Sequence, residues 1–192
     1  MSAAIMTDWL PRHRITVDEY HRMAEVGLLA PDARVELIEG EIIDMAPIGD
    51  VHGTTVDWLT EALVPLVKGR AIVRVQGMIR LSQFSEPQPD IALLKPHPRR
   101  YIDGPPAGDD TLLVIEVSDS SLRYDREIKV SLYARHRVPE VWIVDVPHKQ
   151  IHFHRALVGD SYSDVSVTSD PSVVTIKALP DLPVDLSGML FS

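Results

Sequence analysis

Two acidic residues and one lysine occupy positions from which they could build one chemical site. Asp90 follows Pro89 directly and opens a short apolar run. Glu116 lies inside the apolar sequence LLVIEVSD, where burial of an ionised carboxylate costs several kcal/mol unless a partner compensates it. Lys129 lies on the next expected helix, at the margin of its apolar stripe. Two carboxylates on neighbouring strands can hold a hard divalent cation, and a lysine opposite them can stabilise developing negative charge.

Each of these residues also has an ordinary structural interpretation. An Asp that follows a proline commonly caps a turn, and Glu116 could form an isolated ion pair inside the core. Most single helical lysines are solvated, and Lys129 could be one of them. The three residues together are more specific than any one of them, so the sequence favours a shared site while an arrangement of internal ion pairs stays open.

The hydrophobic pattern predicts alternating strands and helices around these residues. Capping-box spacing from Thr16 to Glu19 opens a short helix that ends near Gly27, and Asp50 could cap a second helix over 51–68. A third helix over 125–136 has an apolar stripe of Ile128, Leu132 and Tyr133. Strands are expected over two parts of 34–45 joined at Glu39-Gly40, and over 71–81, 90–94, 112–117, 140–146, 150–155, 163–168 and 173–177.

This order of elements is typical of an α/β fold with helices on both sides of a central mixed sheet. A length of 192 residues suits one domain, so we expect a single domain over 1–192 with its core at about 34–155. The N-terminal helix and β-hairpin would form an extension of that core.

The composition excludes several classes of protein. The chain has no Cys, which excludes disulfides, thiolate metal sites and a Cys nucleophile. No Walker-type phosphate loop, HExxH helix or Gly-x-Ser-x-Gly elbow is present. The apolar runs are too short for a membrane span, and the N-terminus lacks the pattern of a signal peptide. We therefore expect a cytoplasmic protein with no membrane partner.

The charge is distributed unevenly along the chain. The net charge of −9 argues against a general nucleic-acid coat protein. Residues 70–100 nevertheless carry a net charge of +4, and residues 123–137 carry +3. This pattern is compatible with an ordinary mosaic surface or with a basic middle region that meets a polyanion.

Several segments in order resemble a known family. Pro89-Asp90 followed by Glu116 resembles the signature of the PD-(D/E)xK nuclease superfamily. The surrounding sequence resembles the Uma-two branch of that superfamily, which comprises restriction-endonuclease-like proteins. The similar segments span roughly 16–155 and comprise RVELIEGEIIDMAP, His52, PDIALL, VIEVSDSSLRYDREIKVSLYA and VPEVWIVD. The resemblance implies a restriction-endonuclease-like fold.

One position departs from the superfamily pattern. The lysine expected two residues after Glu116 is replaced by Ser118. The resemblance implies that the lysine has moved to Lys129 on the following helix, from which a long side chain can return to the same point. Catalytic competence then depends on whether Lys129 reaches the two carboxylates.

Several further residues could support such a site. Glu36 is a third acid that could act as ligand or catalyst, although its strand position equally suits a solvent-facing Glu. His52 and Gln76 are candidates for substrate contact. The basic residues that would bring a polyanion to the site are Arg70, Arg74, Arg99, Arg100, Arg123 and Arg126. His152 and His154 share a strand face and could bind metal, but such pairs on an edge strand are usually exposed.

These residues together with the resemblance imply metal-dependent hydrolysis of phosphodiester bonds in DNA. Asp90, Glu116 and the backbone carbonyl of Val117 would hold one Mg²⁺ or Mn²⁺, and Lys129 would stabilise the developing charge. Cleavage of a duplex implies a homodimer. The alternative is a nuclease-like fold without catalytic activity that binds nucleic acid or a protein, which the net charge and Ser118 favour.

Overall fold

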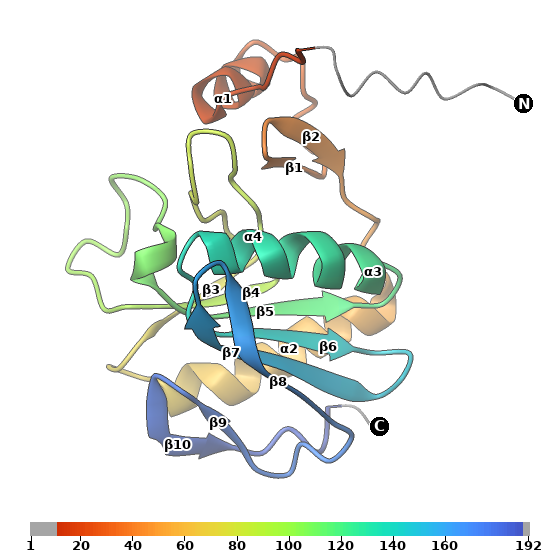
Figure 1. Ribbon diagram of the computed structural model, residues 1–192, viewed down its shortest axis with the longest axis vertical. Helices are drawn as coiled ribbons and strands as arrows, with labels where there is room; N and C mark the ends of the chain where they lie inside the picture. The colour runs from red at the N-terminus through yellow and green to blue at the C-terminus, as the bar shows by residue number, and fades with distance from the viewer. Residues whose placement is uncertain (1–10, 190–192) are drawn as a thin grey trace, which may run out of the picture.

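A six-stranded mixed sheet forms the centre of the molecule (Figure 1). The computed structural model describes residues 11–189. The order in the sheet is β3–β4–β5–β6–β7–β8, with β5 and β6 parallel and all other neighbours antiparallel. The strands are β3 (Ile72–Val75), β4 (Ile91–Leu94), β5 (Thr111–Ser118), β6 (Val141–Asp145), β7 (Gln150–Val158) and β8 (Ser161–Thr168). The prediction of a central mixed sheet with flanking helices is confirmed.

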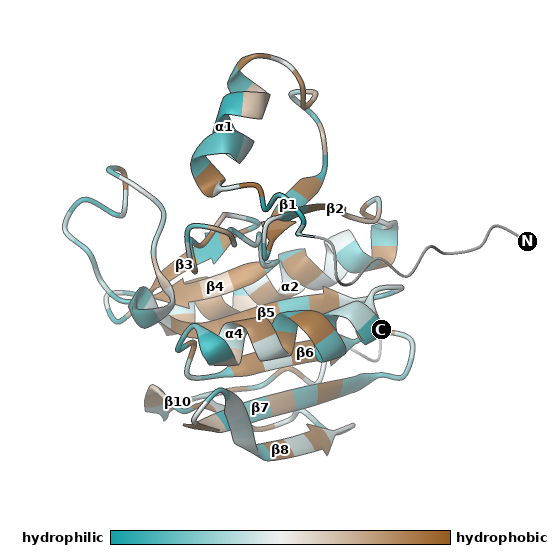
Figure 2. Ribbon diagram, turned by 45° about the horizontal axis from the view of Figure 1, so that its top comes forward, coloured by the Kyte–Doolittle hydropathy of each residue, from teal (hydrophilic) through white to brown (hydrophobic). Residues whose placement is uncertain are grey.

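Helices cover both faces of this sheet (Figures 1 and 2). Helix α2 (Asp50–Leu66) packs on one face. On the other face runs a helical segment made of α3 (Leu122–Tyr124), the π-helical turn η2 (Asp125–Lys129) and α4 (Val130–Arg135). A 3₁₀ turn, η1 (Gly108–Asp110), precedes β5.

The alternation of side chains in β4 shows how two cores arise from one strand. Ile91 and Leu93 pack with the core beneath α2, whereas Ala92 and Leu94 pack with the core beneath α4. Successive side chains of a strand point to opposite faces, so a strand covered on both sides must be apolar throughout. A polar residue on such a strand, such as Glu116 of β5, therefore requires a local partner.

The N-terminal extension lies above the sheet in Figure 1. Helix α1 (Val17–Glu25) begins with the predicted capping box of Thr16 and Glu19. The hairpin of β1 (Val35–Ile38) and β2 (Glu41–Asp44) turns as expected at Glu39 and Gly40, which have φ angles of 51° and 86°. Two positive φ angles in succession are the signature of a type I′ turn.

A buried ion cluster joins this extension to the core. Glu86 is 1% exposed, and its main-chain N–H donates to the Leu37 carbonyl of β1 at 2.8 Å. The Glu86 carboxylate accepts hydrogen bonds from Arg80 and from His21 of α1. Glu86 therefore contacts both the hairpin and α1 and helps to hold them to the core.

The C-terminal part adds a two-stranded ribbon to the α2 side. Strands β9 (Val174–Ile176) and β10 (Leu179–Val184) pair antiparallel and pack on the core beneath α2. The predicted strand at 173–177 corresponds to β9. The sequence did not predict β10, because Pro180 and Pro183 remove backbone donors and weaken a strand signal.

Three local predictions were wrong. Gly49, not Asp50, is the N-cap of α2, and no side chain caps it. The strand expected over 71–81 ends at Val75, because Gln76 has a φ of 46°. Ile128 is 45% exposed and does not join the apolar stripe, because it lies within the π-helical turn.

Within residues 11–189, no helix combines the length and the apolar character that a membrane crossing requires.

Candidate functional site

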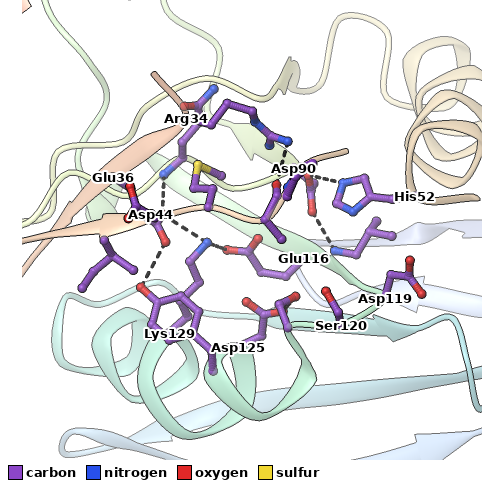
Figure 3. Close-up of a pocket in the computed structure, with 18 of the residues that line it drawn as sticks. Arg34, Glu36, Asp44, His52, Asp90, Glu116, Asp119, Ser120, Asp125 and Lys129 are labelled. Carbon is purple, nitrogen blue, oxygen red and sulfur yellow. Dashed lines mark hydrogen bonds and ion pairs between the residues drawn. The ribbon is translucent and has the colours of Figure 1, made fainter. Parts of the chain in front are cut away.

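The register between β4 and β5 brings the two predicted carboxylates together. Ile91 pairs with Ile115 in the antiparallel ladder, which places the preceding Asp90 across from Glu116. The Val117 N–H donates to Asp90 Oδ2 at 2.9 Å. Asp90 is 7% exposed and Glu116 is 3% exposed. Both acids therefore lie at one end of the two central strands, largely shielded from water (Figure 3).

Lys129 reaches this point from the helical segment. Its Nζ lies 3.1 Å from Glu116 Oε1 and 3.2 Å from Glu36 Oε2. The side chain is buried, and its contacts are shown in Figure 3. Tyr133, one helical turn further on, donates its hydroxyl to the same Glu116 oxygen. The structure therefore places the lysine in direct contact with one of the two carboxylates.

Glu36 enters the site from the hairpin rather than from the central sheet. Its side chain is buried, contrary to the solvent-facing alternative. Tyr124 donates its hydroxyl to Glu36 Oε1 at 3.1 Å, and the Gln88 N–H donates to Oε2 at 3.2 Å. With Lys129 on the same oxygen, three groups hold this carboxylate in place.

Asp125 is a fourth buried acid, which the sequence reasoning did not assign to the site. It lies in the π-helical turn and accepts hydrogen bonds from the hydroxyls of Ser118 and Ser121 at 2.7 and 2.6 Å. Ser118, two residues after Glu116, therefore places its hydroxyl on Asp125. The available signal was the four-residue spacing between Asp125 and Lys129, which brings both to one helix face.

His52 lies on the first turn of α2 and contacts Asp90. Its Nε2 is 2.8 Å from Asp90 Oδ1. This hydrogen bond raises the pKa of His52 above its usual value, against the opposing effect of burial. Of the predicted substrate contacts, His52 is the one whose side chain lines the same pocket as the two central acids.

These groups line one cavity of about 350 Å³. Its walls come from the hairpin and the segment after it, the start of α2, the ends of β4 and β5, and the beginning of the helical segment. The polar residues that line it are Arg34, Glu36, Asp44, His52, Gln88, Asp90, Glu116, Asp119, Ser120, Ser121, Tyr124, Asp125 and Lys129.

The charge of the buried groups is unbalanced. Glu36, Asp90, Glu116 and Asp125 are each less than 10% exposed, and Lys129 is the buried cation among them. Burial raises the pKa of Glu116 to about 8; Lys129 opposes the shift, and the neighbouring acids add to it. Burial also raises the pKa of Asp125. Burial by itself would lower the pKa of Lys129, but the surrounding carboxylates raise it well above its usual value.

This surplus of hard oxygen ligands fits a divalent cation. Mg²⁺ is commonly bound through one or two carboxylates and keeps several waters, so a complete protein ligand cage is not required. In the described part of the chain, no three His, Asp or Glu side chains are grouped as a full metal-ligand set. Asp90, Glu116 and the adjacent Val117 backbone are the groups that could hold the cation.

The other predicted substrate contacts do not line this cavity. Arg99 pairs with Asp103 in the loop that follows β4, at the strand end opposite Asp90, and Arg100 lies in the same loop. Gln76 hydrogen-bonds within the site region through its backbone, to Asp90 and to the Gln88 side chain. The remaining arginines are solvent-facing or paired elsewhere: Arg123 with Glu127, Arg70 with Asp181, Arg74 near Tyr101, and Arg126 on the exposed helix surface.

Comparisons with known proteins identify the family and the fold of the chain. The model of the Uma2 family, described as "Putative restriction endonuclease", matches residues 17–187. A crystal structure of a putative nuclease belonging to DUF820, from Anabaena variabilis ATCC 29413, is similar with a TM-score of 0.69. That similarity covers 92% of this chain and 97% of the other at 17% identity, which shows a shared fold. No curated protein matches the chain.

Proposed function

Because the chain belongs to the Uma2 family of restriction-endonuclease-like proteins, we propose that it is a metal-dependent endonuclease that hydrolyses phosphodiester bonds of DNA. The observation that carries this proposal is the meeting of Asp90 and Glu116 in one pocket, with Lys129 in contact with Glu116. The carboxylates come from neighbouring strands, and the lysine comes from the helix that covers them.

The two central acids and the Val117 carbonyl would hold one Mg²⁺ or Mn²⁺. Such a cation lowers the pKa of water and neutralises charge that develops on phosphate oxygens. Asp90 is already oriented for this role, because the Val117 N–H holds one of its oxygens and His52 holds the other. The excess of buried negative charge favours binding of the cation over an empty pocket.

Lys129 supplies the permanent positive charge of the site. Its contacts with Glu116 and Glu36 keep the ammonium protonated, since a buried lysine without such partners would tend to lose its proton. In this arrangement Lys129 stabilises negative charge on the phosphate in the transition state. Glu36 positions the lysine, and Tyr124 in turn fixes Glu36.

Metal binding is the first test of this function. Calorimetric titration of Mn²⁺ into the wild-type protein should show binding that is lost in Asp90→Asn and in Glu116→Gln. Asp109→Asn is the matched control, because Asp109 is exposed in η1, before β5, away from the pocket. Unchanged Mn²⁺ binding in both pocket variants would remove the proposed ligands.

Cleavage is the second test. Plasmid DNA incubated with Mg²⁺ or Mn²⁺ should be nicked by the wild-type protein, and EDTA should abolish the reaction. If metal binds but no DNA substrate is cut, the alternative of a non-cutting binding module replaces the nuclease. The specific observation in favour of that alternative is the ion pair of Glu116 with Lys129. This pair neutralises part of the negative charge of the pocket without a metal ion.

Cleavage of both strands of a duplex would require two copies of this site. The proposal therefore includes a homodimer. Sedimentation velocity at micromolar concentration should give a species of twice the chain mass of 21.4 kDa. A monomer that only nicks one strand would remove the dimer and leave the hydrolytic site in place.

A further inference from the structure

Arg34 is the one arginine among the residues that line the pocket. It precedes β1 at the base of the hairpin and is partly buried. Its Nη1 donates to the Ala46 carbonyl at 2.8 Å, and its own backbone carbonyl accepts from the Met45 N–H at 2.9 Å. These two bonds attach Arg34 to the segment after β2 and direct its side chain over the pocket toward Asp90 and His52 (Figure 3).

The guanidinium has no carboxylate partner among residues 11–189. This is unexpected, because six acidic residues line the same pocket: Glu36, Asp44, Asp90, Glu116, Asp119 and Asp125. Arg34 nevertheless lies near His52, because its charge partly opposes the increase in the pKa of His52 that the hydrogen bond with Asp90 causes. The hydrogen bond to the Ala46 carbonyl uses one of the five N–H donors of the guanidinium, so most of its donor capacity is left for a ligand.

The other positively charged or ionisable nitrogen groups of the pocket already contact carboxylates. Lys129 contacts two carboxylates, and His52 contacts Asp90. An anionic substrate that enters a pocket with this many acids needs a positive group in addition to a metal ion, because the acids repel it. Arg34 is the group that remains for this purpose.

We propose that Arg34 binds the non-bridging oxygens of the phosphate that is to be cleaved. This assignment rests on the proposed nuclease function and adds the residue that recognises the phosphodiester. A guanidinium matches phosphate with two parallel N–H donors, and it stays protonated throughout the reaction. Arg34 therefore orients the substrate without transferring a proton.

The reaction that it supports is simple hydrolysis. The oxygen of a water molecule forms a bond to phosphorus and that water gives up a proton, while the bond from phosphorus to the leaving oxygen breaks and the leaving oxygen takes up a proton. Arg34 holds the phosphate so that this attack can occur beside Asp90 and Glu116. The contact exists in the ground state as well as in the transition state, so its loss should raise KM.

Phosphate binding can be measured without turnover. The probe is a 5′-phosphorylated thymidine dinucleotide, titrated calorimetrically into the protein with Ca²⁺ and again without metal. Arg34→Ala should weaken binding about ten- to a hundredfold, and Arg34→Lys should weaken it less. Arg22→Ala is the matched control, because Arg22 is exposed on α1, pairs with Glu25 and does not line the pocket.

The outcomes separate this assignment from the function on which it rests. Equal affinity of Arg34→Ala and wild-type protein for the dinucleotide overturns the role of Arg34, as does a wild-type protein that does not bind the dinucleotide at all. Mn²⁺ binding should be unchanged in Arg34→Ala, which shows that the fold and the metal ligands are intact. If the wild-type protein neither cleaves DNA nor binds Mn²⁺, the proposed nuclease function is overturned instead.

Discussion

Glu36 and Lys129 are 93 residues apart in sequence, yet their charged atoms lie 3.2 Å apart in a buried contact. Glu36 belongs to the N-terminal hairpin, and Lys129 belongs to the helical segment over the central sheet. This pair makes the hairpin part of the site. Its docking therefore affects both stability and the proposed chemistry.

Removal of the buried lysine should be costly. Lys129→Met leaves Glu116 and Glu36 without their cation, and breaking a buried ion pair in this way typically destabilises by about 3–5 kcal/mol. Urea unfolding measures the loss. Lys68→Met, at an exposed position just after α2, should change stability by less than about 0.5 kcal/mol.

The double variant Lys129→Met/Glu116→Gln distinguishes a lost ion pair from lost packing. It should recover part of the stability, because burial of Glu116 in the single variant costs free energy whether the carboxyl stays charged or takes up a proton, and Gln avoids this cost. Equal destabilisation of the single and double variants would show that the charge of this pair contributes nothing. DNA cleavage should be absent in both variants.

Tyr124 should matter through Glu36. Tyr124→Phe removes the hydroxyl that donates to Glu36 Oε1, and we expect a loss of about 1–2 kcal/mol in unfolding free energy. Because Glu36 positions Lys129, kcat for DNA cleavage should fall while KM changes little. Tyr101→Phe is the control, since its hydroxyl binds the Lys95 carbonyl in the loop after β4. An unchanged kcat in Tyr124→Phe would limit this tyrosine to a structural role.

Asp125 should tune the affinity for metal without being required for it. Asp125→Asn keeps a side chain that can bind Ser118 and Ser121 but removes one negative charge near Glu116. We expect Mn²⁺ affinity to fall several-fold and thermal stability to stay constant or rise slightly, because a buried charge is removed. Complete loss of Mn²⁺ binding would make Asp125 a direct ligand instead.

His154 should make the protein sensitive to acid. Burial lowers the pKa of His154 to about 4, so the folded protein keeps it neutral where the unfolded chain takes up a proton. Above pH 6.5 the group is neutral in both states and contributes no pH dependence. Stability should fall from pH 6.5 toward pH 4 and level off below it, by about 1–2 kcal/mol after allowance for partial solvent exposure.

Thermal unfolding between pH 4 and pH 7.5 measures this effect. His154→Gln should flatten that part of the profile, because glutamine does not titrate. His97→Gln is the control, since His97 is exposed in the loop after β4. An identical acid profile in wild-type protein and His154→Gln would assign the sensitivity to other groups.

The sequence determined most of the elements that form and which polar residues they carry. Runs of apolar residues in 90–94 and 112–117 require strands that are covered on both faces, and an acid within such a run must find a partner inside the fold. The identification of Asp90, Glu116 and Lys129 as candidates followed from that requirement and from the family resemblance. Local capping and turn chemistry also predicted α1 and the hairpin correctly.

Only the tertiary structure decided which of the other charged residues share the pocket. Docking of the hairpin on the core buries Glu36 and brings Arg34 over the site, and the π-helical turn leaves Asp125 buried while it exposes Ile128. Arg99 and Arg100 lie at the other end of β4 from Asp90. The loops before and after a strand leave it at opposite ends, so residues in these two loops are separated by the length of the strand. Side-chain types and periodicity are local properties, whereas contacts between distant segments depend on register and packing, which no local pattern encodes.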